Sequence, residues 1–238
     1  ETTFKTNLML VYGQSGTGKT SLIQCGLANR FRESDWFYIY VRRRENINVS
    51  LQREIKKKEG TPIPEDATIQ EGIESLYLDF LKPIYLIFDQ FEELFIMGTK
   101  EEQQEFFEVM THLLNDSVSD GQKAVSIKII FIMREEYIAR LDDFENLIPG
   151  LFDHRIRVEQ MHPLKVKEVI RGTTRAFGIR LDRPEETING IIESNLDLKG
   201  TIQLPFLQVY LDRLYKKAEA IKTSTFPGEH PPIVFTPG

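Results

Sequence analysis

The chain has 238 residues, 41% of them hydrophobic, which is enough for one large α/β domain or for a core domain with a smaller second domain. Its formal net charge of −6 argues against broad, non-specific binding to nucleic acid. A single cysteine, Cys25, excludes an internal disulfide framework and fits a reducing compartment. No apolar run approaches the roughly 18 residues of a membrane span. We therefore expect a cytoplasmic protein with no direct contact to membrane or nucleic acid.

The first predicted elements are a buried strand at Leu8–Tyr12 and a helix at Ser21–Ala28. The apolar face of this helix is predicted to consist of Leu22, Ile23, Leu27 and Phe31. Cys25, on the same helix, is expected to be a small buried residue. Between the two elements, Gly13–Thr20 is a complete G-x-x-x-x-G-K-[ST] phosphate-binding loop. A strand before such a loop and a helix after it are the setting of a nucleotide site.

Each residue type in this loop has a physical role in holding phosphate. Glycines let the backbone turn tightly and approach a ligand, so that its N–H groups and those of the following helix converge on an anion. Lys19 adds a positive charge for the β- and γ-phosphates, and Thr20 offers a hydroxyl to Mg²⁺, which prefers hard oxygen ligands. The nucleotide-binding residues predicted here are Gly13, Gln14, Ser15, Gly16, Thr17, Gly18, Lys19, Thr20 and Ser21.

Strand and helix patterns alternate through the rest of the first two thirds of the chain. Further strands are predicted at Trp36–Val41, Ile84–Asp89, Ser126–Met133 and, as a short candidate, Arg155–Val158. Helical patterns lie at Leu51–Lys58, Thr68–Leu81 and Glu101–Asn115. This alternation predicts right-handed crossovers and a parallel sheet flanked by helices, the α/β fold of a P-loop NTPase core over residues 1–160.

The character of the sequence changes near residue 161. Only helical patterns follow, at Lys165–Phe177, Glu185–Ser194 and Pro205–Lys217. They predict a small helical lid subdomain over residues 161–222. Residues 223–238 contain four prolines and are predicted to be a linker towards a downstream domain. The first residue is Glu1 rather than Met, which also indicates a piece of a longer chain.

Three acidic residues follow the third predicted strand, in the string Asp89-Gln90-Phe91-Glu92-Glu93. Asp89 ends a buried strand, where ligands of open α/β sheets gather and where P-loop proteins place the carboxylate that serves Mg²⁺. Glu92 and Glu93 come within reach of a water molecule that attacks the γ-phosphate, and either carboxylate could orient or deprotonate it. The alternative is that one of the two only caps a helix or faces solvent.

Arg134 leaves the fourth predicted strand and so reaches the same edge of the sheet. Its guanidinium can contact the γ-phosphate and offset charge that develops during transfer, or it can form an ordinary ion pair with a neighbouring Glu.

The basic runs Arg42–Arg44 and Lys56–Lys58 are interpreted as solvated faces, since they lack the interleaved aromatics of a nucleic-acid platform. Four scattered histidines show no metal-ligand spacing, so we expect no metal besides Mg²⁺.

These residues resemble a known class of proteins. The combination of Gly13–Thr20, the string D-Q-F-E-E-L-F at Asp89–Phe95 and the strand-end Arg134 resembles STAND NTPases, multidomain signal-transduction ATPases related to the AAA+ branch. The D-Q-F-E-E-L-F string is similar to a bacterial STAND subgroup found beside repeat arrays or effector domains, and to the NACHT pattern. L-P-F-L-Q at Leu204–Gln208 is similar to the family's L-P-L-x motif. The resemblance covers about Leu8–Leu214.

The resemblance implies ATP or ADP with Mg²⁺ as cofactors, and a role for each matching position. The implied residues are Lys19 and Thr20 for the β- and γ-phosphates, Thr20 and Asp89 for Mg²⁺, Glu92 or Glu93 for the water, Arg134 as first sensor and Pro205 against the adenine. Two family features are not found in the sequence: the adenine-contacting segment upstream of the first strand, and the winged-helix domain after the lid.

Three functions are compatible with this pattern. The favoured prediction is a slowly hydrolysing ATP switch in a multidomain signalling or defence protein, which self-oligomerises in the ATP state and acts on sensor and effector domains of its own chain. The alternatives are a P-loop kinase or continuously turning-over ATPase, and a nucleotide-binding scaffold without useful hydrolysis. Adenine is favoured over guanine because the sequence has no G-specific N-K-x-D string.

Overall fold

The computed structural model describes residues 7–28, 30–32, 34–58, 60–116, 125–197, 200–225 and 232–237. The chain forms two compact units, Glu1–Val158 and Glu159–Gly238, and each is described by itself. Within the described ranges, no helix combines the length and the apolar character needed to cross a membrane.

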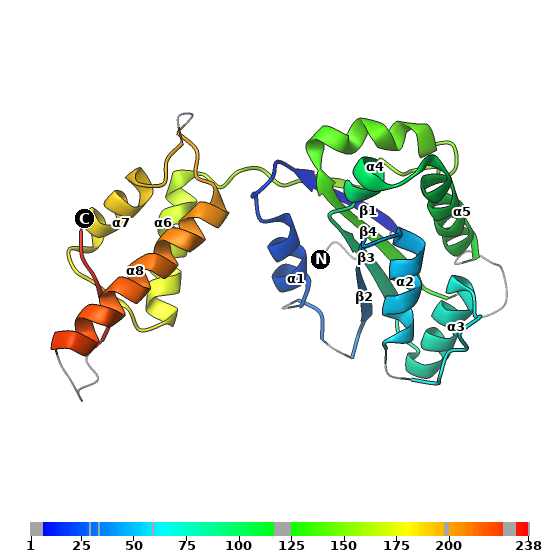
Figure 1. The fold of residues 1–238 in the computed structure, drawn as a ribbon, viewed down its shortest axis with the longest axis horizontal. Coiled ribbons are helices and arrows are strands. Elements are labelled where there is room, and N and C mark those ends of the chain that lie inside the picture. The colour runs from blue at the N-terminus through cyan, green and yellow to red at the C-terminus, as the bar shows by residue number, and fades with distance from the viewer. Residues whose placement is uncertain are drawn as a thin grey trace. The chain divides into compact units, whose positions relative to one another are not determined.

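The first unit is built on a five-stranded sheet in which every paired strand is parallel, as the alternating pattern predicts (Figure 1). Its strands are β1 (Leu8–Gly13), β2 (Phe37–Arg42), β3 (Ile84–Asp89), β4 (Ile127–Arg134) and β5 (Arg155–Arg157). Their order across the sheet is β2-β3-β4-β1-β5, so β4 lies between the strand that precedes the phosphate loop and the strand that ends in Asp89.

The helices of this unit are α1 (Lys19–Ala28), α2 (Ile47–Lys56), α3 (Ile69–Phe80), α4 (Glu93–Met97), α5 (Lys100–Asp116) and the 3₁₀ helix η1 (Glu135–Phe144). The Asn46 side chain caps α2 by accepting from two backbone N–H groups, which is why α2 starts before the predicted Leu51. A capping box of Thr68 and Glu71 starts α3. Neither α4 nor η1 was predicted. Helix α4 is too short to show an amphipathic period, and η1 is a 3₁₀ helix, which does not have the α-helical period.

Helices cover both faces of the sheet, with α1 on one face and α2, α3 and α5 on the other (Figure 1). Strand β3 shows the consequence, because all of its residues are buried. Its residues alternate between the two cores: Leu86 and Phe88 belong to the larger cluster, and Tyr85 and Ile87 to the smaller cluster on the α1 side.

An aromatic cluster fills the larger core beside the end of β3. Its fully buried members are Phe88, Phe91, Phe106, Phe107 and Phe131. Phe91 stacks on Phe131 with ring centroids 4.2 Å apart, and its backbone N–H donates to the carbonyl of Ile132 at 2.9 Å. The chain just past Asp89 is therefore fixed by packing and by the neighbouring strand.

Helix α1 buries less than its sequence predicts. Ile23 is buried, but Leu22 is 47% exposed and Cys25 is also exposed, so both predictions are wrong. Successive residues of a helix are turned by about 100°, so only one row of α1, with Ile23 and Leu27, packs on the sheet.

The basic run after β2 is not a uniformly solvated face. The Arg43 side chain is only 7% exposed and forms a two-pronged ion pair with Glu102 of α5, with N···O distances of 2.9 and 2.8 Å. Glu102 also accepts from the backbone N–H of Ile47 at 2.7 Å, at the start of α2. The pair therefore joins the loop after β2 to the first turns of two helices, and the interpretation as a solvated face is wrong for Arg43.

The described residues of the second unit form three helices around a separate core. They are α6 (Pro163–Ala176), α7 (Pro184–Glu193) and α8 (Leu204–Thr225), close to the predicted positions, with α8 running past its predicted end at Lys217. Their buried side chains include Val166 and Ile170 of α6, Ile188 and Ile191 of α7, and Leu207 of α8. The amphipathic spacing of these apolar residues is what allowed the helices to be predicted.

This unit also contains strands, which the prediction of helices alone missed. Strand β6 (Arg180–Leu181) pairs in parallel with β7 (Val234–Phe235), and Phe235 is 3% exposed within the helical core. Two-residue strands carry no readable period, so the sequence gives no sign of them. Residues 234 and 235 are thus part of the packed unit and not of a linker, while 226–231 lie outside the described residues.

We predict that Arg43→Met lowers the free energy of unfolding of the first unit by about 3–5 kcal/mol, because it leaves the Glu102 carboxylate buried without its cation. Combining it with Glu102→Leu should recover much of that loss, since no buried charge then remains. Urea unfolding followed by the fluorescence of Trp36, the single tryptophan and a buried residue of this unit, measures the effect.

The control is Lys100→Met, which removes an exposed ion pair with Asp143, 3.9 Å long, from the same unit. Its effect should stay below about 1 kcal/mol. Equal effects of Arg43→Met and Lys100→Met would contradict a structural role for the buried pair.

Candidate functional site

The predicted site residues of the first unit gather at the carboxyl-terminal edge of the sheet. The register of the strands places Gly13 of β1 beside Arg134 of β4, and Asp89 of β3 beside Ile132 of the same strand. Because β4 separates β1 from β3, its last residue lies between the phosphate loop and the acidic string. This edge is where ligands of parallel α/β sheets bind.

The phosphate loop has a backbone that only glycine accommodates at three points. Gly16 and Gly18 have φ of 77° and 87°, in the left-handed region. Gly13 has φ of 156°, and a Cβ there would lie 2.2 Å from the carbonyl oxygen of Val158. A side chain at residue 13 would push the loop away from the segment that follows β5.

Lys19 is folded back over this loop. Its Nζ donates to the carbonyl oxygens of Gly13 at 2.8 Å and Gln14 at 2.7 Å. Burial lowers the pKa of the ammonium, and the Glu92 carboxylate, the next largest influence, acts in the opposite direction. The loop thus holds a partly desolvated cation that a phosphate group would stabilise.

Thr20, at the end of the phosphate loop, is in direct contact with Asp89, the first residue of the acidic string. The Thr20 hydroxyl donates to Oδ1 of Asp89 at 2.7 Å, and the carboxylate is almost completely buried. Its other oxygen, Oδ2, accepts a hydrogen bond from the Tyr40 hydroxyl and lies 3.3 Å from the guanidinium of Arg42. Partners from two other segments, the end of the phosphate loop and β2, therefore hold one buried charge in place.

Tyr40 and Arg42 are site residues that the sequence analysis missed. Both lie on β2, two residues apart and so on the same face, and β2 pairs with β3 such that Arg42 lies beside Asp89. Burial raises the pKa of the Tyr40 phenol, and its hydrogen bond to Asp89 raises it further. The only signal in the sequence is that two side chains with polar end groups, Tyr40 and Arg42, lie two residues apart on a predicted strand and so on one face of it.

Glu92 is aimed back at the site by the turn that follows β3. Gln90 adopts a left-handed φ of 53°, and the buried Phe91 anchors the turn. Glu92 is 5% exposed; its carboxylate accepts from the backbone N–H of Arg134 at 3.1 Å and pairs with the Nε of the same residue at 3.1 Å. Glu92 and Arg134 thus form the ion pair that the sequence analysis gave as the alternative role of Arg134.

Glu93 begins α4 and is less buried than Glu92. Burial raises the pKa of its carboxyl, and the Arg42 guanidinium partly opposes that shift. A raised pKa suits a group that exchanges protons. Each of the two glutamates therefore has one attribute of a catalytic carboxylate: the contacts of Glu92 fix its orientation, and burial raises the pKa of Glu93.

The remaining predicted residues differ in their surroundings. Thr17 is buried and its hydroxyl donates to the carbonyl of Gln14 at 3.0 Å, which stiffens the loop, whereas Ser15 and Ser21 are exposed. Pro205 is an exposed residue of α8 and belongs to the second unit. Within the described part of the chain, no three His, Cys, Asp or Glu side chains are grouped as for a metal ion.

The sheet order, the glycine-rich loop at the first strand and the buried aspartate at the third define a P-loop NTPase. The sequence profile of the family described as novel STAND NTPase 1 matches residues 1–227, so the chain belongs to this family of NTPases. It is accordingly a nucleotide-binding domain of the STAND type. No curated protein sequence matches it significantly.

Solved structures confirm the fold. The ORC2 protein of Aeropyrum pernix, solved as ADPNP–ADP complexes, is 14% identical, with a TM-score of 0.63 over 90% of this chain and 58% of that one. ORC1 of the same organism, solved with DNA, is 17% identical, with a TM-score of 0.60 over 92% of this chain and 55% of that one. Cdc6p of Pyrobaculum aerophilum is 14% identical, with a TM-score of 0.58 over 90% and 56%.

The chain therefore spans less than two thirds of the length of these AAA+ proteins. At these identities the likeness establishes a common fold, a parallel sheet flanked by helices with a helical region after it.

Tyr40→Phe should make folding less sensitive to alkaline pH. The raised pKa means that the folded state holds the phenolic proton more tightly than the unfolded chain does. The contribution of Tyr40 to the free energy of unfolding is fully present below its pKa in the unfolded chain, about 10, and declines as the pH rises above that value. Phenylalanine has no phenolic proton, so the variant lacks this decline. Near neutral pH the variant should lose about 1–3 kcal/mol, since Asp89 loses a donor.

Urea unfolding followed by circular dichroism from about pH 8 to pH 11 would measure both effects, a range chosen to bracket the ordinary tyrosine pKa. Tyr38→Phe, which removes a hydroxyl from a half-exposed ring of the same strand, is the matched control. Parallel pH curves for wild type and Tyr40→Phe would contradict the coupling between Tyr40 and Asp89.

Proposed function

We propose that the chain is a Mg²⁺-dependent ATP- and ADP-binding switch domain that hydrolyses ATP slowly, within a multidomain signalling or defence protein. The observation that carries the proposal is the contact between the Thr20 hydroxyl and the buried Asp89 carboxylate, with Lys19 and the Glu92–Arg134 pair at the same sheet edge. Family membership supports a nucleotide site at this edge.

In this proposal the phosphate loop binds the β- and γ-phosphates. Residues 13–20 supply backbone N–H groups at the start of α1, whose dipole favours an anion. Lys19 exchanges its two carbonyl acceptors for phosphate oxygens, which stabilise the charged form that burial disfavours.

The donor set fits Mg²⁺. Thr20 and Asp89 offer two hard oxygens already within 2.7 Å of each other, and Mg²⁺ is commonly bound by one or two carboxylates together with substrate phosphates and water. Thr20 and Asp89 would hold the ion, which when bound supplies charge neutralisation between the β- and γ-phosphates. Tyr40 and Arg42 would keep the Asp89 carboxylate oriented.

Either Glu92 or Glu93 would orient the attacking water, and Arg134 would stabilise charge on the γ-phosphate. In the present arrangement Arg134 is bound to Glu92 through its side chain and its backbone N–H. Hydrolysis then requires the side-chain part of this pair to open, so that both groups become available. This requirement favours slow turnover, as a switch needs.

The adenine nucleotide is supported by the ligands of the A. pernix ORC2 structure, which are ADPNP and ADP. Pro205 of the second unit is proposed to pack against the adenine, on the resemblance of Leu204–Gln208 to the family motif. If ATP and ADP favour different conformations, their exchange alters which surfaces are available for self-oligomerisation and for sensor or effector domains.

We predict that Lys19→Met abolishes ATP and ADP binding in isothermal calorimetry. Glu92→Gln or Glu93→Gln should instead retain binding while one of them lowers ATP hydrolysis by roughly 10²–10⁴-fold, the contribution typical of general acid–base catalysis. The control Glu145→Gln changes an exposed carboxylate of the same unit that is not among the proposed site residues.

Normal hydrolysis in both glutamine variants would contradict the catalytic assignment. Absence of hydrolysis in the wild-type protein, with tight ADP binding, would instead favour the nucleotide-binding scaffold. Fast turnover that requires a second substrate would favour the kinase.

The switch itself predicts a difference between nucleotide states. The full-length protein with bound ADP should differ in sedimentation and in limited-proteolysis pattern from the same protein with a non-hydrolysable ATP analogue, and only the analogue should promote oligomers. The nucleotide released by denaturing the purified protein should be stoichiometric ADP. Identical behaviour in the two states would rule out a switch, since a ligand with equal affinity for both conformations shifts nothing.

A further inference from the structure

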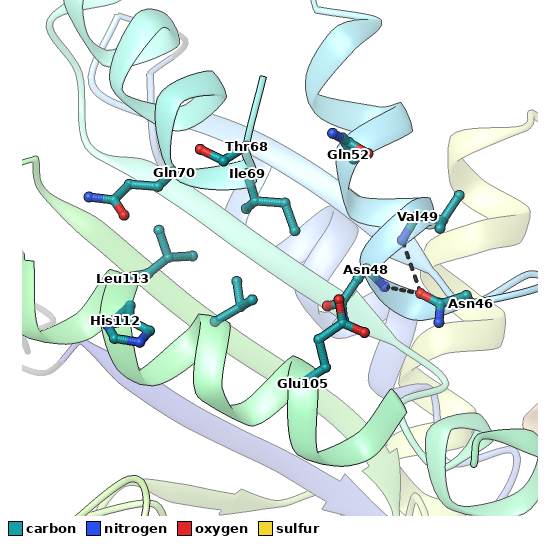
Figure 2. Close-up of a pocket in the computed structure, with 11 residues that line it drawn as sticks. Asn46, Asn48, Val49, Gln52, Thr68, Ile69, Gln70, Glu105, His112 and Leu113 are labelled. Atoms are coloured by element: carbon teal, nitrogen blue, oxygen red, sulfur yellow. Dashed lines mark hydrogen bonds between the residues drawn. The ribbon is translucent and has the colours of Figure 1, made fainter. Parts of the chain in front are cut away.

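A pocket lies on the first unit, and its lining contains none of the residues proposed to bind the nucleotide. It has a volume of about 430 Å³ and is formed by the starts of α2 and α3 and by one side of α5 (Figure 2). Neither the phosphate loop nor the acidic string contributes to its lining. Its size is within the range of small-molecule sites.

The pocket contains a buried amide without hydrogen bonds. Asn48, in the first turn of α2, is 7% exposed, and both its Nδ2 and its Oδ1 lack any hydrogen-bond partner among the described residues. Figure 2 shows this side chain directed from α2 into the space towards α5. Native proteins seldom keep such a group, because an unsatisfied buried amide costs free energy that an apolar residue of similar size would avoid.

Capping of α2 accounts for the polar side chain of Asn46 but not for the buried, unpaired side chain of Asn48. The Asn46 side chain accepts from the backbone N–H groups of Asn48 and Val49, which satisfies the start of α2. The amide of Asn48 has no part in this cap. It presents a donor and an acceptor side by side, which is the pattern complementary to a purine edge, an amide or a similar planar group.

The other lining residues define what kind of ligand would fit. Apolar walls are formed by Val49, Ile69, Val109 and Leu113. Glu105 of α5 adds a carboxylate that is exposed and that has no hydrogen-bond or ion-pair partner in the part of the chain described. None of the described lining residues is Lys or Arg. The lining therefore disfavours phosphate groups and favours an uncharged ring with hydrogen-bond donors.

We propose that this pocket binds an uncharged purine base or nucleoside, with the Asn48 amide paired to the donor–acceptor edge of the purine. The apolar walls would contact the faces of the ring, and the Glu105 carboxylate would accept hydrogen bonds from amino or hydroxyl groups. An Asn amide pairs in this bidentate way with the N6 and N7 atoms of adenine. The site is separate from the proposed ATP site and does not rest on it.

Access to the amide requires a side-chain movement, because both of its polar atoms are closed off from solvent. Glu105 is the side chain suited to move, since it is exposed and no interaction with a described residue holds it. The entry of a ligand would thus give the buried, unpaired amide of Asn48 the hydrogen-bond partners that it lacks.

The test is binding of adenosine, guanosine, cytidine and uridine to the full chain, by calorimetry and ligand-observed NMR. We expect saturable binding of a purine nucleoside and a loss of affinity of about ten-fold or more in Asn48→Leu, which corresponds to the discrimination typical of a bidentate contact. Without ligand, Asn48→Leu should be at least as stable as wild type, since it removes an unpaired amide. Val49→Trp, at a half-exposed position, should block the pocket without altering Asn48.

Two controls separate this site from the proposed ATP site. Gln104→Leu makes the same kind of change on an exposed part of α5 outside the pocket, and Lys19→Met disables the phosphate loop; both should leave nucleoside binding unchanged. No saturable binding of either purine, equal binding of pyrimidines, or binding that persists in both Asn48→Leu and Val49→Trp would overturn the proposal. ATP binding could fail while this site holds, or the reverse.

Discussion

The rest of the candidate site depends on one buried charge, the carboxylate of Asp89. A carboxylate that is 2% exposed is tolerated only if hydrogen bonds and a cation compensate its lost hydration. Here the compensation comes from Thr20 at the end of the phosphate loop and from Tyr40 and Arg42 on β2. Satisfying this charge therefore joins three segments that are distant in sequence, and it fixes the edge of the sheet before any ligand arrives.

The residues that could be predicted from the sequence are those whose neighbours along the chain reveal them. Lys19 and Thr20 belong to a motif with fixed spacing, and Asp89 ends an apolar run that can only be a buried strand. Once the sheet is parallel, strand ends must meet at one edge, so Arg134 could be placed there without coordinates. An ion pair with a neighbouring Glu was one of two roles open to Arg134, and the sequence could not choose Glu92 as its partner, because that contact depends on the turn anchored by Phe91.

What could not be predicted follows from contacts between distant segments. In the sequence, Tyr40 has no feature that separates it from other aromatic residues of strands. Its contact with Asp89 follows from the register of β2 against β3. Arg43 looks like part of a charged surface, and only the docking of α5 buries it against Glu102. In the second unit, Phe235 completes a core through a strand too short to have a pattern. In each case tertiary packing overrides what local composition favours.

The shortness of β5 has a consequence for how copies of this chain can meet. An edge strand offers unpaired backbone groups to any strand that approaches, and long apolar edges promote irreversible joining of sheets. At this edge the strand is three residues long and two of them are arginines, one of which is also held by Glu135. Positive charge from one copy would face positive charge from the next. The length and charge of this edge therefore disfavour sheet-to-sheet pairing there, which would protect a chain proposed to oligomerise reversibly against aggregation through its sheet.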